Sequence, residues 1–329
     1  MKAGSRKVET LKDYCRAFTG AQTPWPELPL IPPFSLAWWQ HWLMETPEEH
    51  RFNHLRTHLP QLWIKPHHGA SSSDCYKRLV LRGRMVKTQE KENCLELNDP
   101  SGFTIKLVKH PCGTYPVIEI DDHDDFRNIL LCLAHRCEQA DIQSSVHAQA
   151  VAGLIHWGLI RTINQNERAE LIILHRAPYS SLPANIIPGK PTEEKWIQLS
   201  QLWRLEHELT HIATRRLVGE MRLNLFDELI ADTLGMIKAL ETFSAVLFLQ
   251  GIGINADGST KKDGRVHTYT RELSEDNKVS ACRYVIKRAN ELEGLLLIGD
   301  ISHERNSLLK FLTQNQLDQP LRTTKPEEK

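Results

Sequence analysis

The chain lacks the features that mark secretion, membrane insertion and nucleic-acid binding. Its 41 basic and 41 acidic residues give a net charge of zero, and no basic tract is dense enough to indicate a nucleic-acid surface. No apolar run has the length of a membrane span, and none follows the first residues as a secretory signal requires. We therefore expect a protein that binds neither nucleic acid nor membranes, although its substrate can still be charged.

The cysteines lack the spacing of a disulfide framework or a redox motif. They are odd in number, and no two of them form a C-x-x-C pair. Such a scattered set favours reduced thiols. We therefore predict a cytoplasmic protein. The cysteines are Cys15, Cys75, Cys94, Cys112, Cys132, Cys137 and Cys282.

The composition is that of an ordinary globular protein, with 40% apolar and 25% charged residues and no internal repeat. Residues 1–120 contain a tryptophan-rich segment and several strand-like stretches, whereas residues 121–329 are mainly helical in pattern. We predict an α+β fold with these two regions. The strand-like stretches are residues 77–86, 94–97, 103–108 and 115–120, with a hairpin turn at 98–102 and another turn at 111–113.

A helix is predicted from Ser35, and it carries Trp38, Trp39 and Trp42. One interpretation is an aromatic ledge that binds peptide. The other is that the tryptophans anchor the N-terminal segment on the core, and large amphipathic rings favour this second interpretation.

Residues 121–125 form an acidic cluster, Asp-Asp-His-Asp-Asp, which invites a cation-site interpretation. The cluster directly precedes a helical pattern that begins at Phe126. Acidic residues at a helix start complement the helix dipole. We therefore favour capping over cation binding.

The most informative stretch is His207-Glu208-Leu209-Thr210-His211, which has the pattern H-E-x-x-H. Two histidines four residues apart in a helix lie on the same face, so both imidazoles can reach one metal ion. Glu208 then lies near the remaining coordination position, where it can take a proton from a metal-bound water.

The surroundings of this motif predict a long helix. Thr192 is a suitable N-cap, and two glutamates follow it in the first turn. No proline or glycine interrupts residues 196–218, and Gly219 is a suitable stop.

A second helix is predicted from an Asn224 cap towards Phe248. It carries Glu228 and Asp232 one turn apart. Catalytic zinc usually takes three protein ligands, so Glu228 is a candidate third ligand and Asp232 a candidate acceptor for a ligand imidazole. The short link at 219–223 lets the two helices pack side by side.

The HELTH and ELIAD stretches resemble the pattern of the gluzincins, the thermolysin-like clan of zinc metallopeptidases, over residues 196–234. The resemblance implies a zincin-like fold, in which the H-E-x-x-H helix packs against the second ligand-bearing helix beside a small upstream β-sheet. It implies that Glu208 is the general base, that Asp232 is a partner of His207, and that Asp227 orients His211. The implied Zn²⁺ ligands are His207, His211 and Glu228.

The same resemblance implies hydrolysis of a peptide or protein substrate. It suggests that the strand at 170–175 forms a sheet edge to which substrate backbone can add. It also calls for a donor to the oxyanion, often a downstream His, Tyr or Arg. The candidates are His267, Tyr269, Arg271, Tyr284 and His303, with Tyr179 upstream.

Two classes of function therefore stand. The first is a zinc peptidase or a related amide hydrolase. The second is a non-catalytic, zinc-stabilised module that binds a partner, for example through the tryptophan-rich segment. A protease encoded together with a dedicated target is a third.

Overall fold

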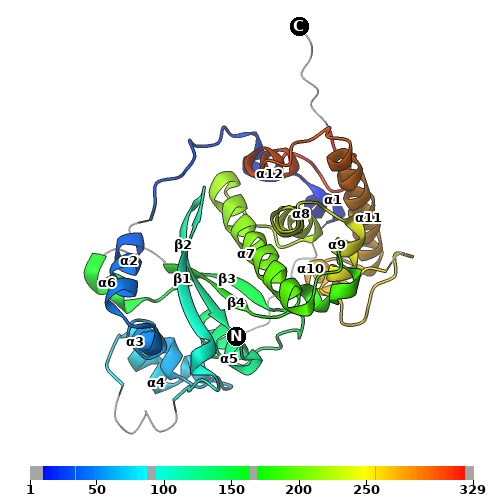
Figure 1. Ribbon diagram of the computed structural model, residues 1–329. Coiled ribbons are helices and arrows are strands. Elements are labelled where there is room, and N and C mark those ends of the chain that lie inside the picture. The colour runs from blue at the N-terminus through cyan, green and yellow to red at the C-terminus, as the bar shows by residue number, and fades with distance from the viewer. Residues whose placement is uncertain (1–9, 34, 87–93, 164–168, 256, 323–329) are drawn as a thin grey trace. The chain divides into compact units, whose positions relative to one another are not determined.

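The chain forms two compact units (Figure 1). The sheet unit spans Glu27–Ala177, and the helical unit combines Met1–Pro26 with Pro178–Lys329. This division differs from the boundary expected after residue 120, because one sheet contains strands from both sides of that position. The computed structural model describes residues 10–33, 35–86, 94–163, 169–255 and 257–322.

The sheet unit is built around four strands in the order β1-β2-β4-β3. These are β1 (Phe103–His110), β2 (Gly113–Ile120), β3 (Ala148–Leu154) and β4 (Ala169–His175). β1 and β2 form an antiparallel hairpin, β2 and β4 are parallel, and β3 runs antiparallel to β4. The predicted strands at 103–108 and 115–120 are confirmed, and so is the turn between them.

β4 is an inner strand, so the expectation of a sheet edge at residues 170–175 is wrong. Its backbone pairs with β2 on one side and with β3 on the other. The reason lies in its composition. The apolar run from Leu171 to Leu174 is entirely buried, which is typical of a strand covered on both faces.

The predicted strand at 77–86 is also wrong. Asp74–Tyr76 forms the short helix α4, and Lys77–Leu81 continues it as a π-helical turn. Ser73 caps α4, since its Oγ accepts a hydrogen bond from Tyr76 N at 3.0 Å. A short apolar run has no period that separates a strand from a helix, and here the local cap selects the helix.

The hairpin expected around Asp99 forms only its turn. Asp99 Oδ1 accepts a hydrogen bond from Ser101 N at 3.1 Å, within the 3₁₀ turn Pro100–Gly102. Residues 94–97 pair with no strand of the sheet. The carbonyl of Leu95 instead accepts a hydrogen bond from Arg56 at 3.0 Å.

The tryptophan helix is α2 (Ser35–Glu45), which begins where predicted. Trp39 and Trp42 are buried, and Trp38 packs edge-on against Trp39 with ring centroids 4.9 Å apart. Buried rings offer no open ledge to a peptide, so these contacts support the interpretation as core anchors.

The acidic cluster at 121–125 caps α5 (His123–Ala134). Asp122 Oδ1 accepts a hydrogen bond from Asp125 N at 2.9 Å. The carboxylate of Asp125 in turn accepts hydrogen bonds from the backbone N–H groups of Asn98 and Asp99, in the turn before β1, each at 2.9 Å. These contacts agree with capping. The other helices of the sheet unit are α3 (Arg51–His58) and α6 (Trp157–Ile163).

The helical unit contains the two helices predicted to hold the metal site. α7 (Glu193–Val218) is capped by Thr192, whose Oγ1 accepts a hydrogen bond from Lys195 N at 3.3 Å. It ends at Gly219, whose φ of 78° is the left-handed conformation that glycine adopts without strain. α8 (Leu225–Leu240) is capped by Asn224. Both predicted helix starts are confirmed.

α8 ends earlier than predicted, and α7 packs closely along it (Figure 1). Glu241 takes a left-handed conformation, and Ser244 caps a new helix rather than extending the old one towards Phe248. Gly235 allows the close approach, because a Cβ there would lie 2.4 Å from Trp203 Cδ1. The remaining helices are α1 (Leu11–Cys15), α9 (Ala245–Ile252), α10 (Val266–Thr270), α11 (Glu275–Leu297) and α12 (Arg305–Thr313).

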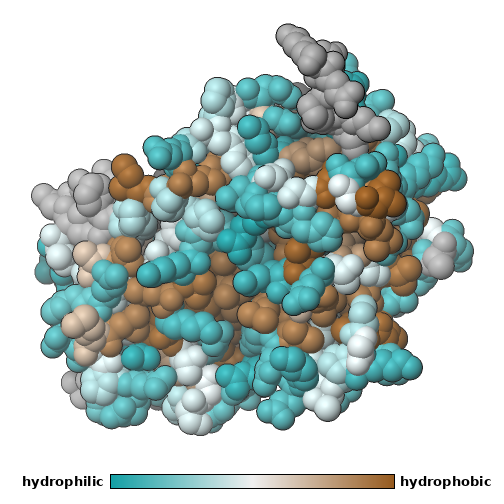
Figure 2. Space-filling model, turned by 45° about the horizontal axis from the view of Figure 1, so that its top comes forward, coloured by the Kyte–Doolittle hydropathy of each residue, from teal (hydrophilic) through white to brown (hydrophobic). Residues whose placement is uncertain are grey.

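Apolar and hydrophilic residues are mixed on the face drawn in Figure 2. Large apolar side chains that are exposed in the helical unit include Val246, Leu297 and Ile298. Exposed apolar residues of this kind are common in folded proteins. Among the described residues, no helix combines the length and the apolar content of a membrane span.

Candidate metal centre

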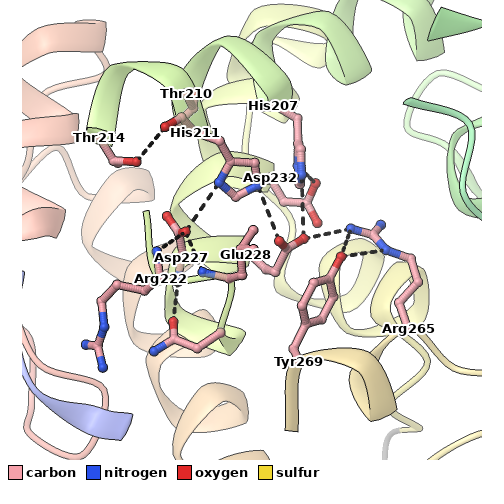
Figure 3. A network of polar contacts seen from close by, with 12 residues as sticks. His207, Thr210, His211, Thr214, Arg222, Asp227, Glu228, Asp232, Arg265 and Tyr269 are labelled. Carbon is pink, nitrogen blue, oxygen red and sulfur yellow. Dashed lines mark hydrogen bonds and ion pairs between the residues drawn. The ribbon is translucent and has the colours of Figure 1, made fainter. Parts of the chain in front are cut away.

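His207 and His211 point from one face of α7 toward Glu228 on α8 (Figure 3). The Nε2 atoms of the two histidines are 3.1 Å apart. Glu228 Oε2 lies 3.5 Å from His207 Nε2, and Glu228 Oε1 lies 3.3 Å from His211 Nε2. Atoms bound at about 2.0–2.1 Å to one tetrahedral zinc ion are about 3.3 Å apart. The three side chains are therefore spaced to hold one divalent metal.

Buried negative charge surrounds these ligand candidates. Asp227, Glu228 and Asp232 are all at most 2% exposed. Buried carboxylates are unfavourable unless cations or donors compensate them. Arg265 compensates Glu228, since its Nη2 lies 2.8 Å from Glu228 Oε2. Burial acts to raise the pKa of Glu228, but the histidines and Arg265 hold it well below its usual range. A cation bound among these groups would be stabilised.

Asp232 orients His207. Its Oδ1 lies 2.8 Å from His207 Nδ1. It also accepts hydrogen bonds from the indole of Trp203 at 3.0 Å and from the hydroxyl of Tyr179. Because Nδ1 donates to Asp232, the lone pair of His207 is at Nε2, which faces Glu228. The predicted pairing of Asp232 with His207 agrees with this geometry.

Asp227 faces His211 at a longer distance. Its Oδ2 lies 3.4 Å from His211 Nδ1. The same oxygen accepts hydrogen bonds from the backbone N–H groups of Arg222 and Leu223, at 2.9 and 3.0 Å. Asp227 therefore ties the link before α8 to the metal face of α7. Burial acts to lower the pKa of His211, but Asp227 and Glu228 outweigh burial and raise it well above its usual value.

Glu208 is half-buried, whereas the two histidines of the motif are buried. Burial lowers the pKa of the nearby Arg204 to about 10, and the negative charge of Glu208 partly offsets this decrease. The partial exposure of Glu208 leaves its carboxylate accessible to solvent.

Tyr269 is the oxyanion candidate that the structure brings next to the cluster. Its hydroxyl accepts hydrogen bonds from Arg265 Nε at 3.3 Å and Nη2 at 3.0 Å, and the same Nη2 binds Glu228 (Figure 3). Burial raises the pKa of Tyr269 well above its usual value. Tyr269 is therefore protonated at neutral pH.

The other oxyanion candidates make different contacts. His267 is exposed, with Nε2 2.9 Å from Lys261 O, and His303 is exposed, with Nε2 3.2 Å from Leu296 O. Arg271 pairs with Glu272 at 3.3 Å. Neither histidine contacts a ligand candidate within the described part of the chain. Tyr179 has another role, because its hydroxyl donates a hydrogen bond to Asp232 Oδ1. The half-buried Tyr284 lies on α11.

The sequence reasoning missed Arg265 and Trp203. Trp203 carried a usable signal, because it precedes His207 by one helical turn and so lies on the same face of α7. Arg265 carried none, since a separate helix and a loop bring it to Glu228.

The family model described as a family of unknown function (DUF7005) matches residues 1–171 and 168–319. The chain belongs to this family. The matched residues include all of α7 and α8. No curated protein and no solved structure matches the chain. The function must therefore be argued from the site, and the likeness to gluzincins stays a prediction.

Proposed function

We propose that this chain is a zinc-dependent peptidase with a zincin-like pair of ligand helices. The observation that carries the proposal is the convergence of His207, His211 and Glu228, whose facing atoms lie 3.1 to 3.5 Å apart. Two imidazoles and a carboxylate are a known ligand set of catalytic zinc, which leaves the fourth position to water. The substrate class that we propose is a peptide or protein.

Each side chain has a defined part in this hydrolysis. His207, His211 and Glu228 would hold the zinc ion, which would supply Lewis acidity and lower the pKa of a bound water. Glu208 removes the proton of the attacking water and passes it to the leaving amine. Asp232 keeps the proton of His207 on Nδ1, and Arg265 holds one carboxylate oxygen of Glu228.

Tyr269 is the side chain that we assign to the oxyanion. Its hydroxyl accepts hydrogen bonds from Arg265 and can donate its own proton to the Glu228 carboxylate; in the proposed reaction this proton turns to the oxyanion. A donor polarised by a neighbouring guanidinium stabilises developing negative charge more strongly than an isolated hydroxyl does.

A second candidate is a metal site without catalysis. The observation that favours it is burial, since His207, His211 and Glu228 are only 5%, 4% and 2% exposed. Structural zinc sites are closed in this way, but they usually take four protein ligands. Three ligands and a half-buried Glu208 favour catalysis.

The cellular setting is part of the same proposal. All seven cysteines are free thiols, which suits a reducing compartment. We therefore place the proposed peptidase in the cytoplasm, where peptide processing is a more suitable role than extracellular digestion.

The first test is the zinc content of protein purified without added metal. We expect about one zinc per chain in the wild type and none in His211→Ala. His267→Ala, which changes an exposed histidine of the same unit, should keep the full content. Circular dichroism checks that His211→Ala is folded. A wild type that contains no zinc and takes up none on titration would overturn the proposal.

A further inference from the structure

Tyr179 belongs to a short turn, Tyr179–Ser181, that lies against α7. Its hydroxyl donates a hydrogen bond to Asp232 Oδ1, the same oxygen that lies 2.8 Å from His207 Nδ1. Its ring stacks on Trp203 with the centroids 4.1 Å apart, which fixes the direction of the hydroxyl. Burial raises the pKa of Tyr179 well above its usual value, so at neutral pH the side chain keeps the proton that it donates. The turn therefore acts on His207 through Asp232.

Ser180, the next residue, contacts the support of a second proposed ligand. Its hydroxyl accepts a hydrogen bond from Arg265 Nη1 at 2.8 Å. The other terminal nitrogen of the same guanidinium, Nη2, lies 2.8 Å from Glu228 Oε2 (Figure 3). A guanidinium is planar and rigid, so an acceptor that holds one of its nitrogens also fixes the direction of the other. Ser180 therefore restricts how Glu228 can turn, and it does so through Arg265.

The backbone of this turn has an unfavourable conformation. Ser180 and Ser181 have φ values of 47° and 58°, in the left-handed region that residues with a Cβ rarely adopt. Two consecutive residues of this kind persist only where the surrounding structure holds them. One such contact is the hydrogen bond that Tyr179 N donates to the buried Ser200 Oγ at 2.9 Å. Backbone strain of this type is concentrated at functional sites, so it is a second sign, independent of the side-chain contacts, that the turn has a role at the metal centre.

We propose, on the basis of the proposed zinc centre, that Tyr179 and Ser180 are positioning residues that hold His207 and Glu228 in place for the metal. One turn of the chain thus supports two ligands that lie on different helices. A ligand that is already oriented loses less conformational freedom when the metal binds. Each of the two contacts should therefore tighten metal binding.

The first experiment removes the acceptor for Arg265. Ser180→Ala should weaken zinc binding about three- to tenfold, which is less than the loss expected for a direct partner of a ligand. Competition of the full chain with a chromogenic chelator measures the dissociation constant. Ser181→Ala is the matched control, because it makes the same change at the neighbouring left-handed position, where the side chain is exposed. Its affinity for zinc should stay within about twofold of the wild type.

A double-mutant cycle tests whether Ser180 acts through Arg265. In an Arg265→Gln background, Ser180→Ala should cause little further loss of zinc affinity, because no guanidinium remains for the hydroxyl to hold. Additive losses in this cycle would overturn the proposed route from Ser180 to Glu228.

The Tyr179 contact is tested without any change to Arg265. Tyr179→Phe removes one donor to Asp232 and keeps the ring that stacks on Trp203. We expect zinc binding to weaken about three- to tenfold, and we expect little further loss when the same change is made in Asp232→Asn. Additive losses here would mean that Tyr179 does not act through Asp232.

The outcomes separate this inference from the proposed function. A wild type that takes up no zinc would overturn both. If the wild type binds zinc while Ser180→Ala and Tyr179→Phe bind it as tightly, only the positioning role fails. That role also fails if Ser180→Ala and Ser181→Ala lose the same affinity. A merely structural turn would lower the stability of the metal-free chain in urea and leave the zinc affinity unchanged, which would equally contradict the proposal.

Discussion

Both units gather histidines, and their surroundings differ. In the helical unit, burial acts to lower the pKa of His211, but the facing carboxylates raise it well above its usual value. In the sheet unit, His58 and His156 lie among the tryptophans of α2, and His156 is 4.5 Å from Trp38 between ring centroids. Burial lowers the pKa of His58 to about 4 and that of His156 to about 3.

The side chains that face a histidine from neighbouring elements decide what it can do. Carboxylates fix the tautomer of an imidazole and add ligand oxygens, so the pair on α7 suits a metal. Aromatic rings supply no such acceptor. His156 instead accepts a hydrogen bond at Nδ1 from Leu159 N at 3.1 Å, which requires that nitrogen to be unprotonated. It is a neutral core residue that caps α6.

We expect the strongest effect from the proposed general base, which has no counterpart among the histidines of the sheet unit. Glu208→Gln should reduce peptide hydrolysis by about 10²–10⁴-fold, because it removes the base and leaves the ligands in place. The measurement is cleavage of a mixed peptide library followed by mass spectrometry, with zinc content determined on the same samples. Glu194→Gln, an exposed position on α7, is the control. Hydrolysis that persists in Glu208→Gln with zinc bound would favour another mechanism.

The next largest effect should come from Asp232, the carboxylate that contacts His207. Asp232→Asn should weaken zinc binding about 10–100-fold, because it removes the charge that orients His207. Competition with a chromogenic chelator measures this affinity. Trp203→Phe, which removes one neutral donor to Asp232, should have a smaller effect. Unchanged affinity in Asp232→Asn would mean that Asp232 does not support the site.

The neutral His156 of the sheet unit should make the stability of the protein depend on pH. Its pKa of about 3 lies below the unfolded value of about 6.5, so its contribution to stability is present above pH 6.5 and is lost as the pH falls. His156→Asn keeps a cap but does not titrate. Between pH 7.5 and 5, wild type should lose about 2 kcal/mol more unfolding free energy than this variant.

Urea unfolding followed by tryptophan fluorescence, with chelator present, measures this difference. Other charged groups act near His156: His58 and His54 from α3, and Arg161, which acts on His58 from α6. These groups are unchanged in the variant, so they cancel in the comparison. Parallel pH profiles for the two proteins would contradict a neutral, buried His156.

The smallest expected effect compares helix caps in the two units. Thr192→Ala should lower the unfolding free energy by about 1 kcal/mol, because it removes the acceptor for Lys195 N at the start of α7. Thr192→Ser should restore most of the loss. Asp122→Ala at the start of α5 should have a larger effect, since Asp122 also accepts a hydrogen bond from the Asn98 side chain. The reverse order would contradict this ranking.

Local signals were enough to predict where α7 begins and ends and where α8 begins. The caps at Thr192 and Asn224 and the stop at Gly219 act within a few residues, so they are visible without knowledge of the fold. The spacing of His207 and His211 follows from the helical repeat. The pairing of Asp232 with His207 was predicted from the resemblance, and the geometry agrees with it.

Local sequence signals could not predict which strands pair with each other in the sheet. An apolar strand such as β4 has the same sequence pattern whether its edges are free or paired, and only its neighbours make it an inner strand. The prediction of a strand at 77–86 was wrong because a run of only three apolar residues shows no period that separates a strand from a helix. The sequence favoured Trp39 and Trp42 as anchors in the core, but only the packing of the folded chain shows that they are buried.

The sequence by itself determined where α7 begins and ends, where α8 begins, and which of their side chains share a face, because caps and the helical repeat are properties of a few neighbouring residues. Tertiary structure decided that Glu228 meets the two histidines, that Arg265 pairs with Glu228, and that Gly235 lets Trp203 reach Asp232. These contacts join residues 17 to 37 positions apart. They depend on how helices pack, which no single stretch of sequence encodes.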